Sequence, residues 1–282
     1  MIVFATALKA EAEPLILRYH LKKDMSIHAF PVYRSDSTML IISGVGKLRS
    51  AIALSFLFGQ EKLADADVLC VNLGFCGSSD PVCRPGKLVQ AARITDMETG
   101  RDYYPDLLRS DRPPLVHLHC ASKRIFRFSV ADSDHSTALP VCYDMESAGF
   151  MESAIRFVTP DRILVLKIIS DDLGSGEIDV DTIKRHLAEQ LSACDALISV
   201  HQLMHQSLAD PIGEADSTQA VLTANHLKLS ESQKRQLMLL VRQYRLAGND
   251  PIPDLLDVKK QKTTTKQERI LIIESLKQKW SK

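Results

Sequence analysis

The chain has 282 residues, in which 35 lysines and arginines balance 35 aspartates and glutamates, and 45% of the residues are hydrophobic. This composition is typical of a folded globular protein and excludes a disordered chain, while the zero net charge gives no global reason to expect nucleic-acid binding. No apolar run reaches the ~18 residues of a membrane span, and the apolar start of the chain lacks the basic flank of a signal peptide.

Short β-branched runs alternate with longer helical patterns over the first two thirds of the chain, which predicts an α/β fold with a central sheet. The predicted strands are Ile2–Thr6, Pro31–Arg34, Met39–Ser43, Val68–Asn72, Lys87–Ile94, Leu115–Leu118, Phe126–Val130 and Arg162–Ile169. The predicted helices are Pro14–Leu21, Lys47–Gly59, Met145–Val158 and Asp179–Met204. The six cysteines form no CxxC pair, so buried reduced thiols and a cytoplasmic protein are expected.

The character of the sequence changes near Ala209. Ser230–Gln233 and Thr265–Glu268 have the spacing of capping boxes, and each precedes an apolar stripe. Pro251-Ile252-Pro253 is expected to be part of the linker between the two helices. The sequence from Gly213 onward contains 13 basic and 8 acidic residues. We therefore expect a helical extension, residues 209–282, after a domain of residues 1–208. The extension is expected to pack on that domain or to contact another subunit or protein, because its basic residues lack the interleaved aromatics of a nucleic-acid site.

Two patterns that suggest ligand sites have ordinary structural explanations. Gly44-Val-Gly46 follows a strand, but Arg49 stands where a dinucleotide fingerprint needs its third glycine. A strand-to-helix turn is the first interpretation, and a turn whose backbone faces a polar ligand is the second. The pairs His201/His205 and His117/His119 have spacings that suit metal ligands, but no supporting carboxylate pattern accompanies them, so no metal site is expected.

Acidic residues lie at three boundaries between predicted elements. Glu11 follows the first strand, Asp144-Met145-Glu146 begins a helix, and Asp171-Asp172 ends an apolar strand. Helix capping can explain each cluster separately. Three such clusters around one α/β sheet favour a shared polar site at the strand ends.

The same residues carry a resemblance to a known family. Six segments occur in order: Ala7–Glu11, Ser43–Lys47, Val71–Gly77, Pro85–Val89, Asp144–Glu146 and Ile169–Asp171. Together they resemble the purine/uridine phosphorylase superfamily, and most of all its methylthioadenosine/S-adenosylhomocysteine nucleosidase and futalosine hydrolase branch. The resemblance spans Met1–His205. It implies one α/β domain with a central twisted mixed β-sheet flanked by helices, and an active site over the strand ends.

The resemblance also implies two catalytic residues. Glu11 matches the base that activates the attacking water, and Asp171 matches the acid that protonates the purine at N7. These residue types suit cleavage of an N-glycosidic bond, because a protonated carboxylic acid can neutralise the leaving purine. No metal or organic cofactor is required.

Four further residues are implied to bind the substrate. Met145 matches the residue that packs on the ribose, and Glu146 matches the carboxylate that holds the ribose hydroxyls and favours a cationic transition state. Gly77 matches a backbone contact near the sugar and base, and Ser170 precedes the acid in the same motif.

The chain departs from the family pattern at several positions. Phe75-Cys76 stand where the nucleosidases usually have Ser-Ala, and Lys167 replaces a usual Arg. Asp172 adds a charge beside the implied acid. Ala121–Lys123 stands in place of a Ser-Gly-Asp segment, which leaves open whether the family's base contacts transfer to Ile125 and Phe126. These departures leave adenine specificity open.

Three functions are consistent with these residues. The first is an N-ribosyl hydrolase that cleaves a purine nucleoside or a 5′-substituted relative of the methylthioadenosine/S-adenosylhomocysteine type. The second is a phosphate-dependent purine nucleoside phosphorylase using Lys47, Arg49 and Arg93, although the family's Gly-x-Arg phosphate motif is absent. The third is a catalytically inactive nucleoside-binding module. The expected partner is a small-molecule nucleoside, and a homo-oligomer, dimer or larger, is expected, with no nucleic-acid or membrane partner.

Overall fold

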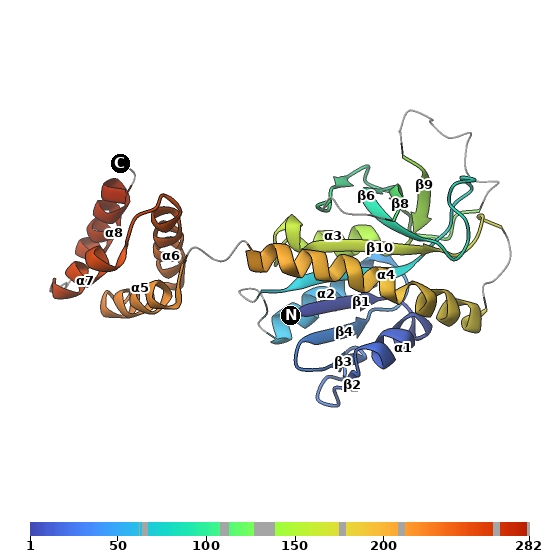
Figure 1. Cartoon of the computed structure of the whole chain (residues 1–282), viewed down its shortest axis with the longest axis horizontal. Coiled ribbons are helices and arrows are strands. Elements are labelled where there is room, and N and C mark those ends of the chain that lie inside the picture. The colour runs from blue at the N-terminus through green and yellow to red at the C-terminus, as the bar shows by residue number, and fades with distance from the viewer. Residues whose placement is uncertain are drawn as a thin grey trace. The chain divides into compact units, whose positions relative to one another are not determined.

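The structure is a computed structural model that describes residues 1–61, 63, 67–107, 113–126, 139–174, 179–207, 212–261 and 266–280. The chain divides into two compact units, Met1–Leu203 and Met204–Lys282, and each has its own hydrophobic core (Figure 1). The predicted strand Phe126–Val130 beyond its first residue, and Thr265 of the second capping box, lie outside the described residues.

The first unit is built on one mixed sheet, which has ten strands within the described residues. The strands are β1 (Ile2–Thr6), β2 (Lys22–Lys23), β3 (Val32–Arg34), β4 (Thr38–Ile42), β5 (Leu69–Cys76), β6 (Leu88–Asp96), β7 (Asp102–Tyr103), β8 (Leu115–Cys120), β9 (Val141–Asp144) and β10 (Ile163–Ile169). Their order is β2-β3-β4-β1-β5-β10-β6-β8-β9, with β7 paired to β6. Strands β4, β1, β5 and β10 are parallel, whereas β6 is antiparallel to β10. The predicted α/β fold with a central mixed sheet is confirmed.

Helices cover both faces of this sheet. Within the described part of the unit they are α1 (Lys9–Arg18), α2 (Lys47–Glu61), α3 (Ser147–Ala154) and α4 (Val180–Ser207), with a short 3-10 turn at Pro160–Arg162. Successive strand residues point to opposite faces, so Val3 joins the core under α2 and α3 while Phe4 joins the core under α1 and α4. Burial on both sides explains why β10 is buried along its whole length.

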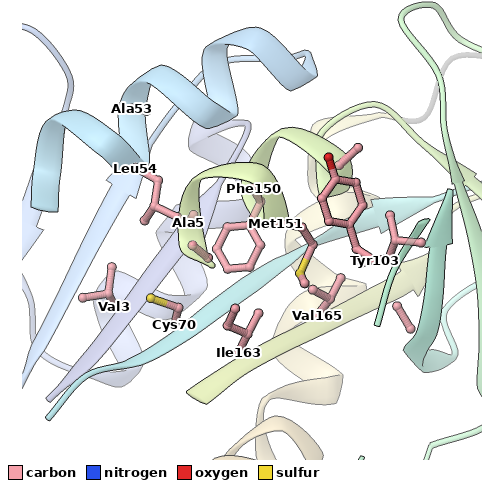
Figure 2. Packing of buried hydrophobic residues seen from close by; sticks show 14 of the residues in the cluster. Val3, Ala5, Ala53, Leu54, Cys70, Tyr103, Phe150, Met151, Ile163 and Val165 are labelled. Atoms are coloured by element: carbon pink, nitrogen blue, oxygen red, sulfur yellow. The ribbon is translucent and has the colours of Figure 1, made fainter. Parts of the chain in front are cut away.

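The core under α2 and α3 is tightly packed. Figure 2 shows Leu54 of α2 and Phe150 of α3 beside the buried strand residues Val3 and Ile163. The two helices also meet backbone to backbone, because a Cβ placed on Gly149 of α3 would lie only 1.8 Å from the carbonyl oxygen of Lys47. Only a residue without a side chain allows this contact.

Two helix starts differ from the prediction. Pro14 was expected to open the first helix, but α1 begins at Lys9 and contains Pro14. The side chain of Glu11 accepts the backbone N–H groups of Ala7 and Leu8, and this contact starts the helix before the proline. Helix α3 spans Ser147–Ala154 rather than the predicted Met145–Val158, and at its start the carboxylate of Asp144 accepts the backbone N–H and the hydroxyl of Ser147.

The sheet also curls back on itself. β9 stands at one end of the strand order, yet Tyr143 of β9 pairs with Gly77, which directly follows β5. The backbone N–H of Gly77 donates to the Tyr143 carbonyl at 3.0 Å, and the N–H of Tyr143 donates to the Gly77 carbonyl at 2.8 Å. The ends of β5 and β9 therefore lie together, although they are distant along the sheet.

The second unit is helical. Within its described residues it has α5 (Glu214–His226), α6 (Glu231–Leu246), α7 (Ile252–Lys260) and α8 (Lys266–Trp280), which share one apolar core. The predicted capping box is confirmed at the start of α6, where Gln233 Oε1 accepts the N–H of Ser230 at 3.0 Å. The sequence analysis identified α6 and α8 but not α5 or α7, and it assigned Pro251–Pro253 to a linker. Those prolines instead open α7, since proline is tolerated in a first turn.

All six cysteines are buried and free of disulfides. No helix in the described part of the chain has the length and hydrophobicity that a membrane crossing requires.

Candidate active site

A cavity of about 230 Å³ lies where β1, β5, β9 and β10 end. Its described lining residues come from the ends of β5 and β9, from the segments that follow β1, β4, β5, β8, β9 and β10, and from α1 and α4: Ala7, Leu8, Glu11, Val45, Phe75, Cys76, Gly77, Lys123, Arg124, Ile125, Tyr143, Asp144, Met145, Glu146, Ser170, Asp171, Leu173 and Ile183. The structure thus brings together all six residues that the sequence analysis selected: Glu11, Gly77, Met145, Glu146, Ser170 and Asp171.

Glu11 is a buried carboxyl group beside this cavity. Its Oε2 accepts the N–H of Ala7 at 2.8 Å and that of Leu8 at 2.9 Å, so one oxygen is held by the backbone. Burial raises the pKa of Glu11 from an ordinary 4.5 to about 7, and the charge of Glu146 adds to the rise, while the Leu8 hydrogen bond and the Lys167 charge oppose it. A carboxyl group that titrates near neutral pH is well suited to accept a proton from water.

Lys167 is the buried cation of the site. It is 1% exposed, and its Nζ lies 2.9 Å from Oδ2 of Asp144. Gly74 leaves space beside it, since a Cβ there would lie 3.5 Å from Lys167 Nζ and 3.3 Å from Glu11 Oε1. Although burial favours the neutral amine, the carboxylates of Asp144, Glu146 and Glu11 hold the pKa of Lys167 above its ordinary value. One ammonium therefore serves three buried carboxyl groups.

Glu146 links the site to the turn before α2. Its Oε1 accepts the N–H of Gly46 at 2.9 Å, and Gly46 has a φ of 108°, which favours glycine. Burial raises the pKa of Glu146, while the charge of Lys167 lowers it. The polar group that this glycine turn faces is therefore a carboxylate of the chain itself.

Asp171 is oriented by its neighbours. Its Oδ2 accepts the hydroxyl of Ser170 at 2.7 Å, and its Oδ1 accepts the N–H of Leu173 at 2.8 Å. A Cβ on Gly77 would lie 3.2 Å from Asp171 Oδ1 and 2.6 Å from Leu173 Cδ2, so Gly77 leaves room for both. Asp172, in contrast, is exposed and is not among the described lining residues.

Two of the three cations considered for a phosphate site are engaged elsewhere. Lys47 pairs with Asp96 at 2.5 Å and with Glu98, and Arg93 makes a two-pronged contact with Asp102. Neither they nor Arg49 are among the described residues that line the cavity. The described cavity therefore has none of the three cations that the phosphorylase alternative required.

Within the described residues, no three or more histidine, cysteine or acidic side chains lie together in a group that could hold a metal ion. His117 and His119 share a face of β8 as the alternation predicts, with ring centroids 4.3 Å apart, and Thr95 contacts His117 Nε2 at 2.7 Å. His201 is buried, and the side chain of His205 lies outside the described residues.

Three residues of the site received no role from the sequence. Lys167 had a usable signal, because a lysine inside an otherwise apolar buried strand must be paired with an acid. Asp144 was grouped with Glu146 without a partner, and nothing in the sequence separated Arg124 from other surface arginines.

Comparison with known proteins identifies the fold. No protein-family model and no curated protein matches the chain. The 5′-methylthioadenosine/S-adenosylhomocysteine nucleosidase of S. pneumoniae, solved with a transition-state inhibitor, has a TM-score of 0.56 at 15% identity, over 68% of this chain and 96% of that one. Futalosine hydrolase of Helicobacter pylori has a TM-score of 0.54 at 12% identity, over 70% and 97%.

A third structure, the nucleosidase of Colwellia psychrerythraea in complex with adenine, has a TM-score of 0.52 at 18% identity, over 66% of this chain and 88% of that one. The chain therefore has the nucleosidase fold, with a helical C-terminal extension. The resemblance seen in the sequence motifs is confirmed at the level of the fold.

Proposed function

We propose that this protein is an N-ribosyl hydrolase that cleaves a purine nucleoside, or a 5′-substituted relative of the methylthioadenosine/S-adenosylhomocysteine type, into free base and sugar. The observation that carries the proposal is that Glu11, Glu146 and Asp171 line one cavity, with the pKa of Glu11 at about 7. Hydrolysis needs a base for water, an anchor for the sugar and an acid for the leaving group, and the three carboxyl groups fit these tasks.

The proposed reaction uses each group once. Glu11 removes a proton from a water molecule as its oxygen bonds to C1′ of the ribose, and the C1′–N9 bond breaks. Asp171 donates a proton to N7 of the departing purine, so the base leaves neutral. Glu146 holds the ribose hydroxyls and Met145 packs on the ribose. Ser170 and the N–H of Leu173 fix the direction of the Asp171 carboxyl.

The charge balance of the site supports a cationic transition state. Glu11, Asp144 and Glu146 are three acidic groups around the single ammonium of Lys167. When all are ionised, the cluster carries excess negative charge in a buried place, where electrostatic interactions are strong. A sugar that becomes positive as the glycosidic bond breaks is stabilised there more than a neutral ground state is.

Water is favoured over phosphate as the nucleophile because Lys47 and Arg93 are paired with carboxylates rather than placed in the cavity. The test is a panel of purine nucleosides assayed for free base with and without phosphate. We expect base and free sugar without phosphate. Release only with phosphate would establish a phosphorylase, and tight binding without release would establish a binding module.

We propose that the protein acts in the cytoplasm as a homo-oligomer, dimer or larger, without nucleic-acid or membrane partners. Light scattering on the purified full chain tests the assembly, and a monomer at micromolar concentration would contradict it.

A further inference from the structure

Arg124 places a guanidinium group beside the carboxyl of Asp171. Both residues line the cavity, and Arg124 Nη2 lies 3.7 Å from Asp171 Oδ2. The same Nη2 donates to the carbonyl of Gly174 at 3.3 Å, and the guanidinium carbon lies 5.3 Å from the centroid of the Phe126 ring. The Arg124 side chain is 38% exposed.

The chemistry of the purine edge makes this neighbour important. N7 is an acceptor in every purine, but the next group on the same edge differs: it is the O6 acceptor in a 6-oxopurine and the N6 amino donor in adenine. Arginine has five N–H donors and no acceptor. Position 6 is next to N7 on the purine and Arg124 is next to Asp171, so a base whose N7 meets Asp171 can present its position-6 group to a side chain that only donates.

We propose that Arg124 is a specificity-determining residue that selects nucleosides of 6-oxopurines over those of adenine; this inference rests on the proposed function. Arg124 donates to O6 while Asp171 contacts N7. An adenine base in the same position puts its amino donor against the guanidinium, and both donors lose their partners.

The test compares substrates that differ only at position 6 of the purine. Base release is measured from inosine and adenosine, and from 5′-methylthioinosine and 5′-methylthioadenosine, in the wild type and in Arg124→Met. We expect the wild type to prefer the 6-oxopurine, and Arg124→Met to reduce kcat/KM for it by about 10- to 100-fold, the range of one good base contact. The adenine substrate should be unaffected or improved.

A binding measurement separates this inference from the proposed function. Dissociation constants for hypoxanthine and adenine are measured for both proteins. A preference for hypoxanthine that disappears in Arg124→Met supports the inference even if no nucleoside is cleaved, in which case only the proposed function fails. A wild type that favours adenine, or an equal loss for both bases in Arg124→Met, overturns the inference. Arg18→Gln, which removes an exposed charge paired with Asp195, is the control.

Discussion

The two compact units of this chain treat their buried charges differently. In the helical unit, Asp216 is held by two hydrogen bonds from Arg245, at 2.9 and 2.6 Å, and by one from the N–H of Gly213. The hydrogen bonds from Arg245 hold the pKa of Asp216 below its ordinary value, against the effect of burial. In the first unit, Lys167 is shared by three carboxyl groups, and the pKa values of Glu11 and Glu146 are raised by burial.

The difference shows when a buried charge indicates a functional site. Asp216 has enough protein donors, so it stabilises the start of α5 and needs nothing else. Glu11 and Glu146 accept backbone N–H groups and share Lys167 with Asp144, and both line a cavity. Burial of these two carboxyl groups costs desolvation free energy. Water or a substrate bound in the cavity can provide the additional hydrogen bonds that compensate for this cost.

Glu11→Gln is the strongest test of the difference between the two units. We expect Glu11→Gln to reduce kcat by about 10²- to 10⁴-fold, because the amide cannot accept the proton of water. In the wild type kcat/KM should rise with pH up to about 7, where Glu11 ionises, and then level off. The variant should lack this dependence. An active Glu11→Gln enzyme with the wild-type pH profile contradicts the role of Glu11 as base.

The contribution of Glu11 to the stability of the fold should decrease with rising pH, whereas activity should increase. A carboxyl group whose pKa is raised by folding stabilises the native state below its unfolded pKa of 4.5, and this contribution is lost as the pH rises to about 7. The loss is about 3 kcal/mol at 1.36 kcal/mol per pH unit. Denaturation at pH 5 and pH 8 should therefore show that Glu11→Gln is relatively more stable at pH 8.

Variants of Lys167 test the buried charge cluster through the free energy of unfolding. Lys167→Met leaves the buried carboxylate of Asp144 without its cation, and we expect a loss of about 3–5 kcal/mol in the free energy of unfolding. Lys167→Arg keeps the charge and should lose less. Adding Asp144→Asn to Lys167→Met should recover part of the loss. Strictly additive effects in this cycle would mean that the two groups do not interact.

Asp171 tests the acid side of the site. We expect Asp171→Asn to reduce kcat by about 100-fold or more, because the amide keeps the shape but has no proton to transfer. Substrate binding should suffer less, since Glu146, the proposed ribose anchor, is unchanged. The matched control Asp172→Asn should be much milder. If Asp171 only caps its loop, Asp171→Asn will melt at a lower temperature and keep its turnover per folded molecule.

Replacing Asp216 should reduce stability and leave activity unchanged, the reverse of the result expected for Asp171. Asp216→Asn weakens a charge-assisted pair whose Arg245 also contacts Asp250, so we expect a loss of about 1–2 kcal/mol in stability. Base release by the folded protein should be unchanged. A loss of activity without unfolding would mean that the helical unit contributes to the site.

The smallest effect on chemistry is expected from removing the extension. A chain that ends near Ala209 should differ in assembly or solubility, while base release per folded molecule is kept. A soluble truncated chain with the same oligomeric state and no activity contradicts this expectation.

Much of the fold follows from local patterns in the sequence. The strands β1, β4, β5, β6 and β10 are buried runs that alternate with helices, and the structure gives their bounds within a few residues of the predicted ones, except for β5, which continues to Cys76. The six selected residues share one cavity because their segments end at neighbouring positions of the sheet. Helix α7 was missed because Pro251–Pro253 looks like a linker, whereas proline in a first turn costs the helix no hydrogen bond.

The rest of the site depends on distant contacts. The pairing of Gly77 with Tyr143 joins segments that are 66 residues apart, and no local sequence pattern predicts it. The same is true of Arg124, which meets Asp171 across the cavity from another loop. Such contacts arise from the curl of the sheet, and periodicity in one segment carries no information about them.

Gly149 has a consequence for anyone who maps this protein by random mutagenesis. It is not among the described lining residues, and it would usually be dismissed as a packing position. Any side chain there must push α3 away from the start of α2, next to the hydrogen bond that joins Gly46 and Glu146. Inactive clones should therefore accumulate at Gly149, and their defect would be a displaced Glu146, the proposed ribose anchor, rather than the loss of a proposed catalytic group.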